Sequence, residues 1–304
     1  MPSNQSDRCD IYQKTTDHII KAIEKGAGDF QMPWHHSGNA ITRPVNIASK
    51  KRYRGGNVIM LWATADAMNY STGIWGTYRQ WQALGAHVRK GQSGTNLIFW
   101  KRTEGAAPDT GNPLGDPDEG ARSRMFARGF TVFNQDQVEG YAPPEANEPL
   151  LEDAMRIPDA QMFFDNLQIA MRYEGDQACF IPSADMIKMP EFARFKSSDA
   201  FYSTLFHEAG HATGAKTRLN RTFGKHFGDE LYSREELTAE LTAAYIMADL
   251  GLACIPRPDH AAYIQSWLRT LRDDPKALLT AASKAQAAAD WMHEAQERAL
   301  KIAA

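Results

Sequence analysis

Cysteine is scarce in this sequence, with three residues in 304, far apart at Cys9, Cys179 and Cys254. An odd, widely spaced set excludes a disulfide framework or a zinc knuckle and indicates reduced thiols. No stretch of eighteen apolar residues occurs, and the first residues lack the apolar segment of a signal peptide. The sequence therefore predicts a cytoplasmic protein with no membrane partner.

Acidic residues are almost missing from one part of the chain, although the net charge is −3. Ten lysines and arginines lie between Arg43 and Arg102, with Asp66 as the single acid. Aromatic residues are interleaved with them, a combination typical of surfaces that bind single-stranded nucleic acid. The alternative is a solvated charged surface, which the shortage of acids disfavours. The aromatics expected in the core instead are Trp62, Trp81 and Phe99.

The candidate nucleic-acid contacts are basic side chains in three clusters of this block. A phosphate backbone would be neutralised by such clusters, and bases would stack on nearby aromatic rings. The candidates are Lys50, Lys51, Arg52, Arg54, Arg89, Lys90, Lys101 and Arg102.

The segment His207-Glu208-Ala209-Gly210-His211 carries the HExxH pattern of zinc metallopeptidases. On a helix the two histidines are one turn apart and share a face, so both imidazoles can reach one metal. Glu208 lies beside them, placed to act as a general base. The alternative, two surface histidines on an amphipathic helix, is less favoured.

The third ligand is expected on a downstream helix that begins near Ser233 and closes at Gly251. The metzincin pattern would need histidine in place of Thr217, so that class is excluded. Glu236 and Glu240 are four residues apart and share one helix face. We predict that Glu236 is the ligand and that Glu240 fixes the tautomer of a ligating histidine. The exchange of these two roles stays open.

Three residues near Glu236 have other expected roles. Glu235 points about a quarter-turn away, so we expect it on a solvated acidic face. Ser233 is expected to cap the helix, with Glu236 in the capping-box position. His226, in a glycine-flanked stretch, is a rival third ligand.

Two histidines and one carboxylate leave a fourth position for water, which is typical of a catalytic zinc site. The expected cofactor is Zn²⁺, with another divalent metal such as Mn²⁺ as the alternative. Zinc would acidify the water and polarise a scissile carbonyl, while Glu208 would carry the proton to the leaving amine. Tyr202 and Tyr232 are near in sequence, but nothing places either hydroxyl at the metal, and the oxyanion-stabilising role is unassigned.

The distribution of elements predicts an α+β protein of two domains. Residues 1–142 form the first domain, with a flexible insertion at 103–121 that is rich in glycine, proline and aspartate. Residues 143–157 are a linker and residues 158–304 form the second domain. Helices are expected from residue 6 or 7 to 25 and at 58–68, 77–81, 158–170 and 277–299. Strands are expected at 94–102, 128–133, 171–175, 177–181 and 185–189, with 178–181 or 186–189 as a substrate-pairing edge.

Several motifs resemble those of the ArdC-like anti-restriction proteins of conjugative plasmids. They are spread over nearly the whole chain, with residues 103–121 as the variable part. The segments that carry the resemblance are residues 12–17, 53–57, 75–81, 85–91, 131–134, 206–208, 218–221, 235–237 and 260–264.

The resemblance implies a single-stranded-DNA-binding N-terminal domain, also seen in TraC-type plasmid primases, joined to a zincin-like metallopeptidase domain. It implies protection of incoming plasmid DNA from host restriction during conjugation. The matched segments 53–57 and 89–91 become the foremost DNA-contact candidates, which adds Tyr53 to the basic residues.

Two functional hypotheses follow. In the first, the protein binds single-stranded DNA and cleaves a host protein at the metal site. In the second, it shields single strands without catalysis, and the metal site is structural or residual. A plain peptidase without a DNA role is disfavoured by the basic block.

Overall fold

The computed structural model describes residues 16–17, 20–21, 43–68, 70–103, 124–141, 153–224, 230–254, 260–274 and 276–303. Nearly all of the expected insertion, most of the linker and most of the first expected helix lie outside these residues. His226 also lies outside them. Residues 153–157, assigned to the linker by sequence, belong to helix α4 (Asp153–Asp165).

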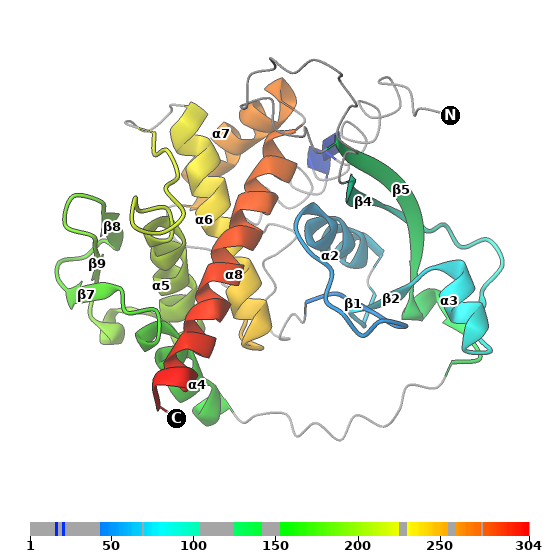
Figure 1. Ribbon diagram of the computed structural model, residues 1–304, viewed down its shortest axis with the longest axis horizontal. Helices are drawn as coiled ribbons and strands as arrows, with labels where there is room; N and C mark the ends of the chain where they lie inside the picture. Colours follow the sequence, from blue (N-terminus) through cyan, green and yellow to red (C-terminus); the bar gives the residue numbers. More distant parts are fainter. Residues whose placement is uncertain are drawn as a thin grey trace, which may run out of the picture.

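The N-terminal elements form a four-stranded sheet in the order β1-β2-β5-β4. Its long antiparallel pair, β4 and β5, runs in register from Thr95 opposite Val132 to Thr103 opposite Arg124. The apolar helix α2 covers β4, and the short helix α3 packs against β2, β3 and β5 (Figure 1). The elements are β1 (Val45–Asn46), α2 (Gly56–Met68), β2 (Ile74–Gly76), α3 (Tyr78–Ala83), β3 (His87–Val88), β4 (Thr95–Thr103), β5 (Arg124–Asn134) and β6 (Val138–Glu139).

The C-terminal elements form a small sheet in the order β7-β9-β8, followed by helices. Because β9 is central, residues 186–189 cannot serve as a substrate-pairing edge, and that alternative was wrong. Of the two predicted alternatives, the segment 178–181 remains, because it contains the edge strand β8. The elements are β7 (Ala170–Tyr173), β8 (Cys179–Ile181), β9 (Met186–Met189), α5 (Ser198–Ala212), α6 (Glu230–Asp249), α7 (His260–Asp273) and α8 (Ala277–Ala303).

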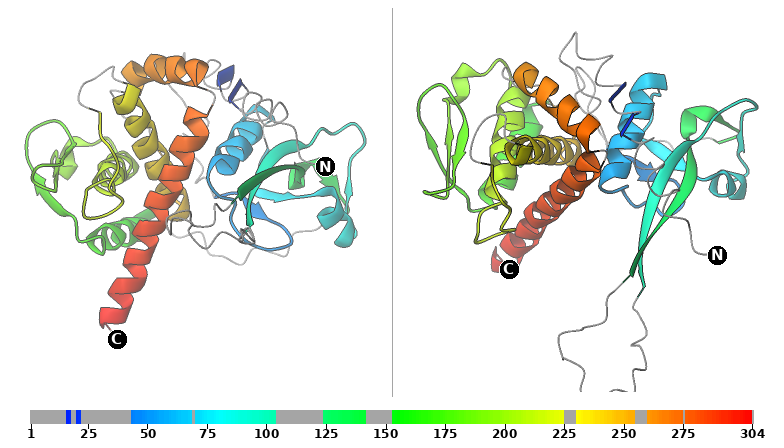
Figure 2. Two further views of the ribbon diagram at one scale, coloured as in Figure 1. Left: turned by 45° about the horizontal axis from the view of Figure 1, so that its top comes forward. Right: turned by 90° about the horizontal axis from the view of Figure 1, so that it is seen from above.

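Helix α6 lies between α5 and α8 and is buried along most of its length (Figure 2). It ends at Asp249, and Gly251, the glycine expected to close it, follows with a φ of 70° that favours glycine. Its start differs from the prediction. The helix begins at Glu230, so Ser233 is buried one turn inside and is not the N-cap.

The side-chain packing confirms two aromatic predictions and overturns a third. Trp62 and Trp81 are buried core residues, as expected. Phe99 was predicted in the core, but its side chain is 56% exposed. It lies on the same face of β4 as Leu97, which is buried, so the cover over this face does not extend to Phe99.

Polar contacts join the N-terminal elements to α6 and α8. Arg52 Nη1 lies 2.7 Å from Asp249 Oδ1 at the end of α6, and Arg54 Nη2 lies 2.5 Å from Asp290 Oδ2 on α8. The Tyr245 hydroxyl donates to the Gly55 carbonyl at 3.0 Å. Buried apolar residues of α2, α6 and α8 belong to one continuous core. The two sets of elements therefore pack directly on each other.

We expect Asp249→Ala to destabilise the protein much more than Asp290→Ala. The Asp249 side chain is 3% exposed and contacts Arg52, His293 and Arg43. Arg43 is buried, and this burial is the main cause of its lowered pKa. Removing this carboxylate leaves buried positive charge uncompensated, a loss of about 3–5 kcal/mol. Asp290 is half-exposed, and its loss should cost at most about 1 kcal/mol.

Thermal and urea unfolding of both variants measure this difference. Equal unfolding midpoints for Asp249→Ala and Asp290→Ala would contradict a buried electrostatic junction.

Candidate metal centre

Helix α5 presents two histidines to one point. Its N-terminus is capped by Ser197, whose hydroxyl accepts from the Ala200 amide, and residues 201–210 of the helix are buried. His207 and His211 lie one turn apart, with their Nε2 atoms 3.1 Å from each other. Two ring nitrogens this close need a shared proton or a shared cation between them.

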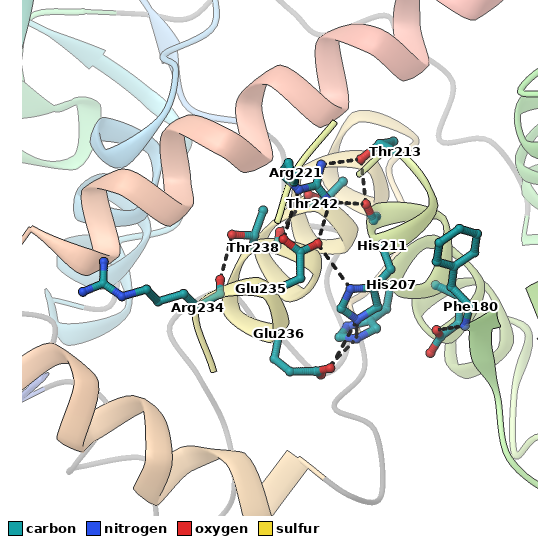
Figure 3. A network of polar contacts seen from close by, with 12 residues as sticks. Phe180, His207, His211, Thr213, Arg221, Arg234, Glu235, Glu236, Thr238 and Thr242 are labelled. Carbon is teal, nitrogen blue, oxygen red and sulfur yellow. Dashed lines mark hydrogen bonds and ion pairs between the residues drawn. The ribbon is translucent and has the colours of Figure 1, made fainter. Parts of the chain in front are cut away.

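Helix α6 brings Glu236 to the same point. Its carboxylate oxygens lie 3.4 Å from His207 Nε2 and 3.3 Å from His211 Nε2. The edge of a tetrahedron with metal–ligand bonds of 2.0–2.1 Å is about 3.3 Å. The two Nε2 atoms are separated by close to that edge, and each has a different oxygen of Glu236 at a similar distance, so this donor set fits a divalent ion with a further position for water. Figure 3 shows the three side chains converging.

The other ring nitrogen of each histidine faces a carboxylate. His207 Nδ1 lies 3.3 Å from Glu240 Oε2, and His211 Nδ1 lies 3.4 Å from Glu235 Oε1. A carboxylate there keeps the proton on Nδ1 and leaves the Nε2 lone pair for a metal. The geometry supports the roles that the sequence assigned to Glu236 and Glu240.

Glu235 does not lie on a solvated acidic face, and that prediction was wrong. Its side chain is 5% exposed and is held by the guanidinium of Arg221 through bonds of 3.0 and 2.7 Å. Arg221 also donates to the Thr213 hydroxyl and the Gly210 carbonyl, each at 2.7 Å. The arginine therefore fixes Glu235 against the end of α5 (Figure 3).

Sequence reasoning gave Arg221 no role at the metal centre. The only sign was its place in the segment Arg218-Leu219-Asn220-Arg221, just after the histidine helix. The helical spacing that located Glu236 and Glu240 carries no information about a loop that folds back over α6.

The charges of the cluster are strongly coupled. Burial alone lowers the pKa of His211, but attraction by Glu236 and the hydrogen bonds that Glu235 and Glu236 accept from the ring outweigh it and raise the pKa to about 10. Burial raises the pKa of Glu236, yet the two histidines bring it well below its usual range. The acidic neighbours thus favour positive charge at this point, and a bound cation would compete with the proton on His211.

Glu208 points from α5 toward the edge strand β8. The backbone amide of Phe180 donates to Glu208 Oε2 at 2.8 Å, which fixes the carboxylate at the strand edge. In an antiparallel pair, alternate residues direct their backbone groups away from the partner strand. Phe180 and Ala178 therefore turn their backbone groups toward the site, where an extended peptide can pair with β8.

A cavity of about 240 Å³ lies over this arrangement. Tyr232 lines it, whereas Tyr202 is buried, with its hydroxyl 3.4 Å from Gln161 Oε1 and its pKa raised to about 12 by burial. Of the two tyrosines considered by sequence, Tyr232 is the one at the cavity. The lining residues are Ala178, Cys179, Phe180, Pro182, Glu208, His211, Phe223, Gly224, Tyr232, Glu235 and Glu236.

We expect Glu235→Gln to weaken metal binding by about 10- to 100-fold without abolishing it, since residues that orient ligands typically contribute this much. Loss of the carboxylate leaves the His211 ring less firmly oriented and Arg221 without its charge partner. Isothermal titration with Zn²⁺ and Mn²⁺ measures the change. Glu191→Gln, an exposed acid on the same domain, is the control. Unchanged affinity in Glu235→Gln would contradict the orienting role.

The candidate DNA contacts divide into two groups. Lys50, Lys51, Arg89 and Lys90 have exposed side chains. Arg52 and Arg54 are more than half exposed but are paired with Asp249 and Asp290. Tyr53 is buried, and its hydroxyl accepts from Asn46 at 3.0 Å. Lys101 and Arg102 lie on β4, and their side chains fall outside the described part of the chain.

Comparison with known proteins finds matches to both the N-terminal and the C-terminal part of the chain. The N-terminal domain of the anti-restriction factor ArdC matches residues 9–133, and a zincin-like metallopeptidase family matches residues 158–284. The metal-free crystal structure of the antirestriction protein ArdC from plasmid R388 superposes with a TM-score of 0.76 at 35% identity, covering 95% of this chain and 98% of that one. The chain belongs to the ArdC antirestriction family.

Other relatives of this ArdC-family protein fit the same assignment. Protein y4eC of Sinorhizobium fredii, described as uncharacterized, is 55% identical over 95% of this chain and 94% of its own length. The DNA primase TraC of Escherichia coli is 33% identical over 95% of this chain, which corresponds to 20% of TraC. The Mn(II)-bound crystal structure of the R388 ArdC has a TM-score of 0.73. The expected α+β fold and the family are confirmed. The zincin-like domain, the Mn(II)-bound relative and the cluster of His207, His211 and Glu236 indicate a site for a divalent metal.

None of the helices in the described part of the chain is long and apolar enough to span a bilayer.

Proposed function

We propose that this ArdC-family protein binds single-stranded DNA through its N-terminal domain and hydrolyses a peptide bond of a host protein at its metal centre. These activities would protect incoming plasmid DNA from restriction during conjugation. Zn²⁺ is the proposed ion, with Mn²⁺ as the alternative. The observation that carries the proposal is the ligand triangle of His207, His211 and Glu236, with Glu208 held beside an edge strand.

The chain's own residues account for the steps of hydrolysis. A bound divalent ion would supply acidity to a water molecule and polarise a carbonyl. An extended peptide pairs with β8, which places its scissile bond next to Glu208. Glu208 takes the proton of the attacking water through its carboxylate and delivers it to the leaving amine. Glu235 and Glu240 keep the histidine rings in one orientation throughout.

The DNA-binding part rests on charge and exposure. The block from Arg43 to Arg102 has ten basic residues and one acid. Each phosphate that such residues neutralise releases counterions, so affinity should fall steeply with salt. Affinity for a labelled single-stranded oligonucleotide, measured from 50 to 200 mM salt, tests this directly. Salt-independent or absent binding would contradict the proposal.

The hydrolytic part is tested with an unfolded protein substrate. Cleavage should require a divalent ion, stop with a chelator, and resume when Zn²⁺ or Mn²⁺ is restored. Intact DNA binding without any cleavage would favour the non-enzymatic alternative, in which the metal supports the fold.

A further inference from the structure

The aromatic side chains of the N-terminal elements are not equally available to a ligand. Among those that the structure describes, Trp62, Trp75 and Trp81 are buried, whereas Tyr78 is 50% exposed. Phe99 is exposed too, but its side chain is on the face of β4 that also carries the buried Leu97. Tyr78 therefore stands apart as an exposed ring on the opposite face.

Tyr78 is held in place by the elements around it. It begins helix α3, where Thr77 and Gln80 form a capping box. The buried Trp81 fastens this helix to β5 by donating its indole N–H to the Phe133 carbonyl at 3.1 Å. The Tyr78 ring meets the Phe133 ring edge-on, with centroids 6.4 Å apart. An exposed aromatic fixed in this way loses little entropy when a ligand stacks on it.

Small or short side chains lie next to the Phe133 ring. Thr131 Oγ1 donates to Asn96 Oδ1 at 2.8 Å on the exposed face of the β4–β5 pair. A Cβ atom at Gly94 would lie 2.4 Å from Thr131 and 2.9 Å from Phe133, so only glycine allows the chain to pass this close to the two side chains. Figure 1 shows α3 beside this end of β5.

Two exposed basic residues lie on the segments that carry Tyr78 and Gly94. Arg79 follows Tyr78 on α3 and is exposed. Lys90 is exposed in the turn that leads to Gly94, and Gln137 anchors this turn by bonds to the Ser93 carbonyl and to the Arg89 amide. Residues 67–103 contain no aspartate or glutamate. An anionic ligand therefore meets no opposing carboxylate from this stretch of chain.

The turn at residues 50–54 is less suited to stacking. Tyr53 is buried, and the guanidinium groups of Arg52 and Arg54 already contact acids of α6 and α8. The structure thus separates two features that the sequence placed together: charge near the domain junction, and an exposed, positioned ring on α3.

We propose that Tyr78 and Phe133, bordered by Arg79 and Lys90, form the surface on which unpaired bases of a single-stranded nucleic acid stack. The inference rests on the proposed DNA-binding function and gives it a location. Bases lie over the Tyr78 ring and over Gly94 and Thr131. Arg79 and Lys90 bind the adjacent phosphates. A duplex cannot use this surface, because its bases are already stacked.

Binding of a labelled oligothymidylate to the full-length protein tests the location. Tyr78→Ala should weaken binding by about 5- to 150-fold, the usual effect of losing one stacking ring, and Tyr78→Phe should bind as the wild type does. Because no phosphate contact is lost, the salt dependence of Tyr78→Ala should stay unchanged. Lys90→Ala should lower the salt slope by about 0.7, the value for one phosphate contact on a single strand. Tyr173→Ala is the control, a 44% exposed tyrosine on β7 of the other domain.

Several outcomes separate the location from the function itself. Wild-type protein that binds no single strand contradicts the proposed function. Wild-type binding that Tyr78→Ala and Tyr173→Ala leave equally intact overturns the stacking surface alone. Photocrosslinking to an iodouracil-containing strand gives an independent readout, expected on the peptides that hold Tyr78 or Phe133. Crosslinks confined to residues 50–54, or equal affinity for duplex and single strand, would also overturn it.

Discussion

Glu208→Gln is expected to lower the rate of peptide hydrolysis by about 10²–10⁴-fold, the usual contribution of a positioned general base. The carboxylate is buried, reaches the edge of β8 and accepts the Phe180 amide at 2.8 Å. Glutamine keeps the size and the acceptor oxygen but cannot take the proton of the attacking water. The ligand triangle does not include Glu208, so affinity for Zn²⁺ or Mn²⁺ should stay close to that of the wild type.

The measurement is the initial rate on an unfolded protein substrate at saturating metal. Glu235→Gln is the matched control, since it keeps the base and should recover activity when the metal concentration is raised. A Glu208→Gln protein that retains metal and cleaves at the wild-type rate would exclude Glu208 as the base.

Glu236→Gln is expected to weaken metal binding by more than about 100-fold. Its two oxygens lie within 3.4 Å of the histidine Nε2 atoms, so the substitution removes the only negative charge of the predicted donor set. Outer carboxylates contribute about 10- to 100-fold to affinity, and a direct ligand should contribute more. The effect should therefore exceed that of Glu235→Gln.

The loss can be read from stability as well as from titration. An ion present at 1,000 times its dissociation constant stabilises the folded state by about 4.1 kcal/mol. After a 100-fold loss of affinity the same concentration would give about 1.4 kcal/mol. The metal-induced rise in melting temperature should shrink accordingly in Glu236→Gln and stay unchanged in Glu191→Gln. An undiminished rise in Glu236→Gln would place the ion elsewhere.

The sequence could locate the metal centre because helical spacing is local information. His207 and His211, and Glu236 and Glu240, are each four residues apart, so each pair shares a helix face wherever the helices pack. The packing of α5 on α6 then brings the two faces together, which no spacing predicts. The environment of Glu235 depended on Arg221, fourteen residues earlier in the chain, and the sequence analysis missed it.

The N-terminal domain shows the same limit. The basic block and its aromatics predicted an anionic ligand from composition alone. Composition could not show that Arg52 and Arg54 contact Asp249 and Asp290, which lie 197 and 236 residues further along the chain. Nor could it distinguish the buried Trp81 from the exposed Tyr78, three residues apart on α3. Long-range packing decides which members of a charged and aromatic stretch stay accessible.

Helix α6 connects the two proposed activities physically. Its first half carries Glu235, Glu236 and Glu240 at the metal centre, and its second half carries Tyr245 and Asp249 at the contact with the N-terminal elements. The metal site and the domain junction are thus built on one buried helix.

The most direct test of the account is protection of plasmid DNA during conjugation into a restricting host, with wild-type protein compared with Glu208→Gln. The variant must first be shown to bind metal and single-stranded DNA as the wild type does. The account predicts that such a variant loses protection, because hydrolysis of a host protein is part of the function. Full protection by the variant would contradict it and would leave DNA binding alone to explain anti-restriction.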